Sequence, residues 1–288
     1  MSKKKKSDIL PRFITAVVAL PLLVSLIAFA PHWGFFLFIL VAATISIWEF
    51  CGILMATGDG SVEHPSGRVM TVVMGLLLMS VFYFAEAYFI PALTGVTLVV
   101  FLFYLFVYKE ISKVTHYIGT SLTAVLYGGV LFTFIPLLGR DGGDAGWMWI
   151  IMLLTLIWSS DTGAYFAGTF LGKHKLYPSV SPNKSIEGAV GGLAATIAFA
   201  FLANAIFSYF FPEAWTSLGA VQILILAIPA NILGQTGDLA ESLLKRAHKV
   251  KDSGTIIYGH GGILDRIDAL FFAAPWVYYF LLYGVHTS

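Results

Sequence analysis

Carboxylates are the side chains in this sequence best suited to chemistry, and they are unevenly distributed. The chain has 16 Asp and Glu residues. Seven of them fall at or near two polar stretches, at about 161–188 and 238–263: Asp161, Glu187, Asp238, Glu241, Asp252, Asp265 and Asp268. Mg²⁺ prefers oxygen ligands and commonly bridges carboxylates to substrate phosphates. The pattern therefore predicts a site for one or two divalent cations that serves phosphate chemistry.

The stretch from Gln235 to Arg246 carries acids and cations at helical spacing. If the apolar segment before it continues as a helix, residues three and four apart share one face: Asp238, Glu241, Ser242 and Lys245. Acids on this face could bind magnesium, and Lys245 and Arg246 could bind phosphate oxygens. The alternative is an ordinary Glu241–Lys245 ion pair on a solvated helix end.

A glycine-rich segment follows, in which Lys251-Asp252-Ser253-Gly254 and Gly259-His260-Gly261-Gly262 lead into Asp265-Arg266-Ile267-Asp268. Glycines before a helix leave backbone N–H groups accessible and let a phosphate approach closely. Asp265 and Asp268 share a face at the start of an apolar span, and Arg266 offers a fork suited to phosphate. The alternative for the two aspartates is simple complementation of the helix dipole. His260 could bind phosphate or only shape its loop.

The earlier polar stretch contains Asp161-Thr-Gly-Ala-Tyr165, then Lys173 and Lys175, then Ser181-Pro-Asn183-Lys184-Ser185-Ile-Glu187-Gly188. Ser, Asn and Lys around a proline turn could bind phosphate or a nucleobase edge, although Ser-Pro-Asn is also common turn chemistry. The alternative role for Lys173 and Lys175 is that of positive charges that keep this stretch on the cytoplasmic side of the membrane. Carboxylates dominate over histidines, and Cys51 is the one cysteine, so a zinc site is not expected.

Composition indicates which elements must position these residues. The chain is 58% hydrophobic and 11% charged, with a mean hydropathy of +0.84. Soluble domains carry about 25% charged residues, so this chain needs lipid around it. Segments of about 20 apolar residues can span a bilayer. Nine are expected, at 13–30, 32–49, 69–90, 91–108, 117–138, 146–160, 189–211, 218–237 and 264–284. The fold expected is an all-α, polytopic membrane helix bundle with no separate soluble domain.

Basic residues predict the orientation of these spans, because Lys and Arg collect on the cytoplasmic side. With the N-terminus inside, 16 of the 17 Lys and Arg residues fall on the cytoplasmic side and only Arg140 falls outside. The C-terminus is then outside, and both polar stretches face the cytoplasm. The lysine run at 3–6 with the apolar segment after it resembles a signal peptide. Because Pro31 follows Ala28-Phe-Ala30, where cleavage would occur, we expect a retained span. Glu49 ends the second span and is expected at an interface.

The signature residues resemble a known family. Ser242-x-x-Lys245-Arg246, Lys251-Asp252-x-Gly254, His260-Gly-Gly262 and Asp265-Arg266-x-Asp268 are similar to the signature of phosphatidate cytidylyltransferases, also called CDP-diacylglycerol synthases. Gln235-x-Gly237-Asp238 and the blocks at 161–165 and 181–188 look like other family blocks. The resemblance is sharp from about residue 158 and rests on hydropathy before that. Tyr258 departs from the small residue or proline usual there, which affects the expected loop conformation.

The resemblance implies an enzyme that makes CDP-diacylglycerol and pyrophosphate from CTP and phosphatidate with magnesium, at a bacterial inner membrane. Asp238 and Asp265 then correspond to metal ligands, with Asp268 and Glu241 as supporting acids. Phosphate binders would be Lys245, Arg246, Lys251 and Arg266. Substrate contacts are expected from the set Asp161, Ser181, Asn183, Lys184, Ser185, Glu187, His260, Gly261 and Gly262. Residues 1–145 would form a scaffold and 146–288 the catalytic part. The partners are the two substrates and the bilayer, without nucleic acid, and a homodimer is left open.

Two other functions remain open on the sequence alone. A CTP-dependent polyprenol or phytol kinase has a related architecture, but such kinases lack the full signature. A cation-coupled transporter could use acids at helix ends, although transporters place such acids near the bilayer midplane in broken helices. The acids here collect instead toward one predicted interface.

Overall fold

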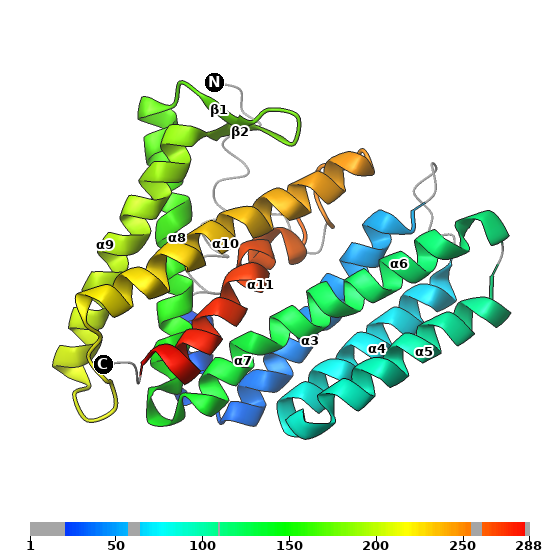
Figure 1. Cartoon of the computed structure of the whole chain (residues 1–288), viewed down its shortest axis with the longest axis horizontal. Helices are drawn as coiled ribbons and strands as arrows, with labels where there is room; N and C mark the ends of the chain where they lie inside the picture. The colour runs from blue at the N-terminus through cyan, green and yellow to red at the C-terminus, as the bar shows by residue number, and fades with distance from the viewer. Residues whose placement is uncertain (1–20, 57–63, 109, 255–260, 286–288) are drawn as a thin grey trace. The chain divides into compact units, whose positions relative to one another are not determined.

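The computed structural model describes residues 21–56, 64–108, 110–254 and 261–285. Within them, eight helical segments are long and apolar enough to cross a membrane: 32–54, 65–84, 86–106, 111–141, 143–171, 186–210, 220–247 and 264–284. These correspond to the second through ninth predicted spans. Figure 1 shows a molecule made almost entirely of such helices. The predicted polytopic all-α fold is therefore confirmed. Of the first predicted span, residues 13–20 lie outside the described residues, and 21–29 is helical.

Several predicted boundaries were wrong because hydropathy marks apolar segments rather than helix ends. Helix α8 (Gly146–Leu171) continues well past residue 160, so the first half of the predicted loop at 161–188 is helical. Helix α10 (Ala220–Ala247) likewise runs past residue 237, as the face containing Asp238 requires. The third and fourth predicted spans, placed at 69–90 and 91–108, are separated instead by a turn at Glu86–Tyr88. Pro91 lies in the next helix, in the first turn, where proline is tolerated.

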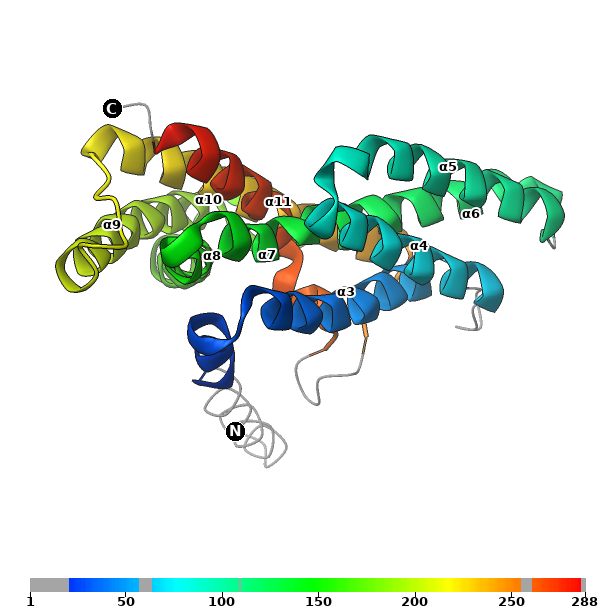
Figure 2. The same cartoon turned by 90° about the horizontal axis from the view of Figure 1, so that it is seen from below.

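The chain forms two compact units, and the first contains residues 1–130 together with 248–266. Its helices are α3 (His32–Leu54), α4 (Pro65–Phe84), α5 (Phe89–Phe106) and α6 (Val114–Ala124), followed by a π-helical turn at Val125–Val130. Helix α4 packs against α3, α5 and α6, and these helices lie side by side in Figures 1 and 2. The Thr71 hydroxyl donates to Ser121 Oγ at 2.8 Å, so these two buried hydroxyls of α4 and α6 are paired with each other.

The second unit contains residues 131–247 and 267–288. It includes α7 (Leu131–Asp141), α8, α9 (Ile186–Phe210), α10 and most of α11 (Leu264–Tyr279), which ends in a π-helical turn at Phe280–Gly284. Helices α8 and α9 run antiparallel and side by side (Figures 1 and 2). Their close approach depends on small residues, since a Cβ on Gly163 would lie 2.5 Å from Ala195 Cβ and 2.7 Å from the Gly191 carbonyl oxygen. Small residues at helix contacts are the usual solution in membranes.

A short antiparallel hairpin joins α8 to α9. It consists of β1 (Lys175–Tyr177) and β2 (Ser181–Ser185), with Lys175 opposite Ser185 and Tyr177 opposite Ser181. Ser185 is the N-cap of α9, and its Oγ accepts from Gly188 N at 3.1 Å. At the other end, Glu187 accepts from the backbone N–H groups of Lys173 and His174. The hairpin is thus anchored at its base, and its second strand faces the C-terminal half of α8.

The α8–α9 contact generates a stability prediction. Gly163→Ala should lower the unfolding free energy by about 1–3 kcal/mol, because its methyl group meets backbone that cannot move aside. Thermal unfolding in detergent measures the effect. The matched control is Gly95→Ala in α5, where a Cβ would meet nothing within 4 Å and the higher helix propensity of alanine acts alone. Equal stability of the two variants would contradict this account of the packing.

Candidate functional site

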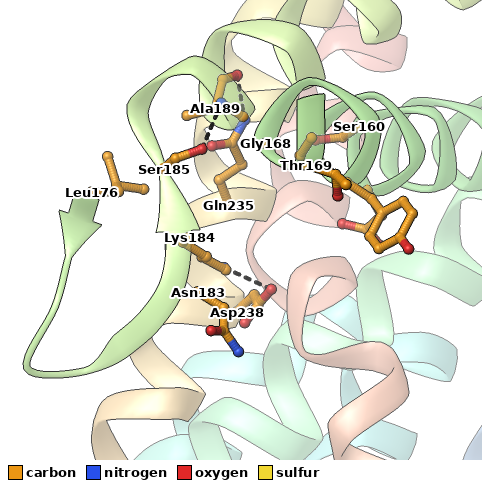
Figure 3. A pocket seen from close by; sticks show the side chains of 14 residues that line it. Ser160, Gly168, Thr169, Leu176, Asn183, Lys184, Ser185, Ala189, Gln235 and Asp238 are labelled. Atoms are coloured by element: carbon orange, nitrogen blue, oxygen red, sulfur yellow. Dashed lines mark hydrogen bonds and ion pairs between the residues drawn. The ribbon is translucent and has the colours of Figure 1, made fainter. Parts of the chain in front are cut away.

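A cavity of about 620 Å³ opens between the C-terminal half of α8, the β-hairpin, the start of α9 and α10. Ligand pockets commonly have volumes of about 300–1,000 Å³. Figure 3 shows the side chains that line it, among them Ser160 and Thr169 from α8, Asn183 and Lys184 from β2, and Asp238 from α10. Asp161 lines it too. Most of the site residues predicted in the first polar stretch therefore line the same cavity as Asp238, the first acid of the second stretch.

The ion pair between Lys184 and Asp238 connects the hairpin to α10. Lys184 Nζ lies 2.7 Å from Asp238 Oδ2, and both side chains are about one-third exposed. The pair is visible as a dashed line in the middle of Figure 3. Asp238 Oδ1 also accepts a long hydrogen bond of 3.5 Å from Ser242 Oγ, one turn further along α10. A cation and an anion that both face the cavity can bind a phosphate-bearing ligand and its counter-ion.

Behind Asp238, the same face of α10 is buried. Glu241 is 1% exposed and Lys245 8%, and Lys245 Nζ lies 2.6 Å from Glu241 Oε2. The solvated ion pair considered from the sequence is therefore a buried one. Asp268 of α11, also buried, lies within electrostatic reach of both Glu241 and Asp238. Helix α11 can come this close because residue 237 is a glycine. A Cβ at that position would lie only 2.7 Å from the Asp268 carbonyl oxygen.

The acids fit a hard divalent cation by their chemistry. Asp238, Glu241 and Asp268 supply only carboxylate oxygens, and two of them neighbour lysines that offset part of their charge. In the described part of the chain, no group of three His, Cys, Asp or Glu side chains is already arranged around a metal position. Mg²⁺ does not need such a cage, because it is usually held by one or two carboxylates with water and substrate phosphates completing its shell. These residues are thus compatible with a metal that arrives with its substrate.

Asp265 belongs to the first unit and lies in the first turn of α11. Its Oδ2 accepts hydrogen bonds of 2.9 Å from Ser253 N, Ser253 Oγ and Gly262 N. Gly261 has a φ of +85°, a conformation that favours glycine, and a Cβ there would lie 2.8 Å from the same oxygen. Hydrogen bonds therefore join Ser253, Gly262 and Asp265 at the start of the helix.

The remaining predicted site residues occupy varied positions. Ser181 is half-buried at the start of β2, Gly262 is buried, and Lys251 and Arg266 are exposed. Arg246 donates from Nε to the Val180 carbonyl at the hairpin turn, at 3.3 Å. Ser185 and Glu187 hold the hairpin base through the hydrogen bonds described above. His260 and Tyr258 lie outside the described residues. The roles in binding and catalysis expected of all these residues stay predictions.

The sequence was compared with known families. Residues 10–283 match the family described as "Cytidylyltransferase family". The chain belongs to the cytidylyltransferase family. Membership confirms the resemblance drawn from the signature residues. The family match also covers the N-terminal helices, where hydropathy alone had supported the resemblance.

Curated members of the cytidylyltransferase family resemble the chain over part of its length. It is 39% identical to a phosphatidate cytidylyltransferase of Bacillus subtilis over 165 residues, which are 57% of this chain and 58% of that protein. It is 43% identical to a phosphatidate cytidylyltransferase of Staphylococcus aureus over 154 residues, or 54% and 55% of the two chains. The alignments thus span somewhat more than half the length of these relatives.

One polar network in this cytidylyltransferase-family chain was missed from the sequence. Asn231, 1% exposed within α10, donates from Nδ2 to Ser160 Oγ at 2.7 Å and to Thr196 Oγ1 at 2.9 Å. Gln235 Nε2 donates to Asn231 Oδ1 and to the Ala189 carbonyl. With both amide hydrogens used inside the protein, Gln235 borders the cavity through a side chain of fixed orientation. The detectable signal was polar residues one turn apart, at 231 and 235, within an apolar helix.

A second missed residue is Glu49. It was expected at an interface, but α3 continues to Leu54 and Glu49 is only 3% exposed. Its carboxylate accepts a hydrogen bond from Leu264 N at the start of α11. The prediction failed because the span was ended at the first charged residue, whereas a buried charge can remain inside a helix when a distant segment supplies its partners.

The buried Glu241–Lys245 pair leads to a second stability prediction. Lys245→Met should lower the unfolding free energy by about 3 kcal/mol, since it removes the ammonium group from a buried carboxylate. The double variant Glu241→Gln/Lys245→Met should recover most of that loss, as measured by thermal unfolding in detergent. Lys113→Met is the control, because it breaks the exposed Glu110–Lys113 pair and should cost less than about 1 kcal/mol. Equal effects of the two lysine substitutions would contradict the assignment of a stabilising buried pair.

Proposed function

We propose that this protein is a phosphatidate cytidylyltransferase, which transfers CMP from CTP to phosphatidate and releases pyrophosphate. Support comes from its membership of the cytidylyltransferase family and from the names of its curated relatives. The observation that carries the proposal is the position of Asp238. It faces the cavity, pairs with Lys184 there, and belongs to the acid cluster that includes Asp268.

The proposed reaction is an in-line displacement. A phosphate oxygen of phosphatidate attacks the α-phosphorus of CTP, the bond from that phosphorus to the oxygen bridging to the β-phosphorus breaks, and pyrophosphate leaves. The attacking phosphate is already an anion near neutral pH, so no side chain has to remove a proton. Catalysis would rest on positioning and charge neutralisation. Both substrates are polyanions at their reacting ends, which is why cations and metal-binding acids must occur together.

In this proposal Lys184 exchanges Asp238 for a substrate phosphate, since its ammonium group already faces the cavity. Arg246, Lys251 and Arg266 are further candidates for phosphate binding. Lys245 would act mainly through Glu241, to which it is bound in a buried position. Asp238 and Asp265 would hold Mg²⁺, with Glu241 and Asp268 as supporting acids. When bound, one or two such ions neutralise charge on the triphosphate and on the leaving pyrophosphate.

An apolar groove next to the cavity suits the lipid substrate. It has a volume of about 320 Å³ and is lined mainly by aliphatic residues of α9 and α10, including Val190, Leu193 and Ile232. It shares Leu176, Ala189 and Gln235 with the polar cavity. An acyl chain in this groove would leave the phosphate headgroup directed at the cavity. We therefore place phosphatidate along α9 and α10, with CTP reaching the cavity from water.

The location proposed for this multi-pass protein is a bacterial inner membrane, with the site facing the cytoplasm. The asymmetry of Lys and Arg supports this orientation, because it puts both polar stretches on the side where CTP is available. The proposed partners are CTP, phosphatidate and the bilayer, without nucleic acid; a homodimer stays a prediction.

The test uses purified protein in detergent with phosphatidate, Mg²⁺ and CTP labelled in either the α- or the γ-phosphate. The α-label should enter the lipid and the γ-label should be released in pyrophosphate, and chelation of the metal should stop both. Transfer of the γ-label to a polyprenol or phytol acceptor would identify a lipid kinase instead. Absence of transfer to any of these lipids would favour the transporter.

Two substitutions assign the acids in that assay. Asp238→Asn and Asp265→Asn should each reduce turnover by about 100-fold or more, because each removes a carboxylate that would hold the charge-neutralising Mg²⁺, while thermal unfolding shows intact protein. Asp144→Asn is the control, since Asp144 is exposed and lies in the turn before α8. Near-normal rates of both acid variants at saturating magnesium would refute the metal assignment.

The groove is tested by filling it. Val190→Trp should raise the KM for phosphatidate several-fold and leave the KM for CTP nearly unchanged, because the indole would occupy space proposed for an acyl chain. The control is Val221→Trp, which places the same side chain on α10 at a similarly exposed valine (69%, against 62% for Val190) outside the groove. A parallel rise in both KM values, or the same effect at Val221, would exclude this groove as the lipid site.

A further inference from the structure

Glu49 is a buried acid that none of the predicted roles uses. It lies in α3, some 200 residues before the signature segment in the sequence, and is 3% exposed. Burial of a carboxylate costs several kcal/mol unless hydrogen bonds or a counter-charge compensate it. Arg68 of α4 lies within electrostatic reach, but its Nε and Nη2 both donate to the Trp48 carbonyl. Arg68 thus contributes a nearby positive charge, whereas the hydrogen bonds that Glu49 accepts come from another segment.

Those contacts come from the signature segment in the same compact unit. Glu49 Oε2 accepts from Leu264 N at 2.9 Å and from Ser253 Oγ at 3.3 Å. Leu264 is the first residue of α11, where helical N–H groups lack intrahelical acceptors and a negative charge complements the dipole. The Glu49 carboxylate thus performs for α11 the function that a local capping residue usually performs.

Two signature glycines are explained by the same carboxylate. A Cβ on Gly254 would overlap Glu49 Oε1, and a Cβ on Gly262 would overlap Oε2. The backbone of the segment is therefore pressed against Glu49 on both sides. From the sequence, these glycines suggested room for a phosphate. In the structure, the space that they leave accommodates a side chain from α3.

Ser253 connects Glu49 to Asp265. Its hydroxyl lies between the two carboxylates, at 3.3 Å from Glu49 Oε2 and 2.9 Å from Asp265 Oδ2, and its backbone N–H also donates to Asp265. A hydroxyl has one proton to donate, so the two acids compete for it. Ser253 is therefore in contact with both carboxylates and links the side chain of α3 to Asp265.

We propose that Glu49 is a positioning residue of the enzyme: from α3 it fixes the start of α11 and, through Ser253, the carboxylate of Asp265. The N-terminal helices would then contribute directly to catalytic geometry rather than serve only as a scaffold. The kinetic part of this inference rests on the proposed cytidylyl transfer. The structural part, the anchoring of Ser253 and Leu264 by one side chain, does not.

The test compares Glu49→Ala and Glu49→Gln with the wild type by hydrogen–deuterium exchange and by steady-state kinetics. In Glu49→Ala, peptides that cover the amides of Ser253, Gly262 and Leu264 should exchange faster, while peptides from α4 and α5 are unchanged. The kcat should fall by about 10- to 100-fold, as expected for a displaced catalytic group, with both KM values nearly constant. Glu49→Gln keeps an acceptor for Leu264 N and should retain kcat within a few-fold of wild type. Glu110→Ala, an exposed acid of the same unit, is the control.

Wild-type exchange at these amides in Glu49→Ala, or an unchanged kcat, would overturn the proposal. Should Glu49→Ala fail to fold, Ser253→Ala decides, because it removes only the hydroxyl between the two acids. It should lower kcat with little change in KM, and wild-type kinetics for it would refute the coupling to Asp265. If the wild-type protein transfers no CMP, the proposed function fails, whereas the exchange measurement still tests the anchoring.

Discussion

The dominant physical constraint in this protein is the cost of holding carboxylates among apolar helices. An ionised acid removed from water must be given partners, and each important acid here has its own arrangement. Asp238 is matched by Lys184 from the hairpin, Glu241 by Lys245 one turn along its helix, and Glu49 by backbone and hydroxyl donors of the signature segment. These pairings determine which distant parts of the chain must lie together. The helices supply the apolar surroundings that make each pairing necessary.

Close helix contacts make those pairings possible. Lys184 reaches Asp238 because the hairpin is fixed at its base by Ser185 and Glu187 and because glycines let α8 and α9 pack closely. In water the hydrophobic effect would drive such packing, but lipid is as apolar as the helix surfaces, so shape and small residues must provide it. The buried Asn231 network adds specificity, since its amide has its partners only when α8, α9 and α10 are in register.

The sequence predicted the fold class and the family, for identifiable reasons. Runs of apolar residues revealed eight helices, and the spacing of Asp238, Glu241 and Lys245 revealed a helical face, because both signals are periodic and local. Helix ends were predicted less well, since α8 and α10 leave the apolar region without ceasing to be helical. Glu49 was misread because its partners are about 200 residues away, and no local pattern encodes such a contact. The same holds for the hairpin, whose strands are too short to show alternation.

The anchoring of α11 by a distant acid follows from the composition of the signature itself. A segment in which Gly254, Gly261 and Gly262 surround the helix start can approach another group closely, but it has few side chains with which to hold its own shape. A local Ser or Asp cap satisfies N–H groups within one turn, and Asp265 performs that function for Gly262. The N–H of Leu264 still needs an acceptor, and a carboxylate from a packed neighbouring helix provides both the acceptor and the favourable charge. The start of α11 is therefore held by a side chain from α3, far outside its own segment of the sequence.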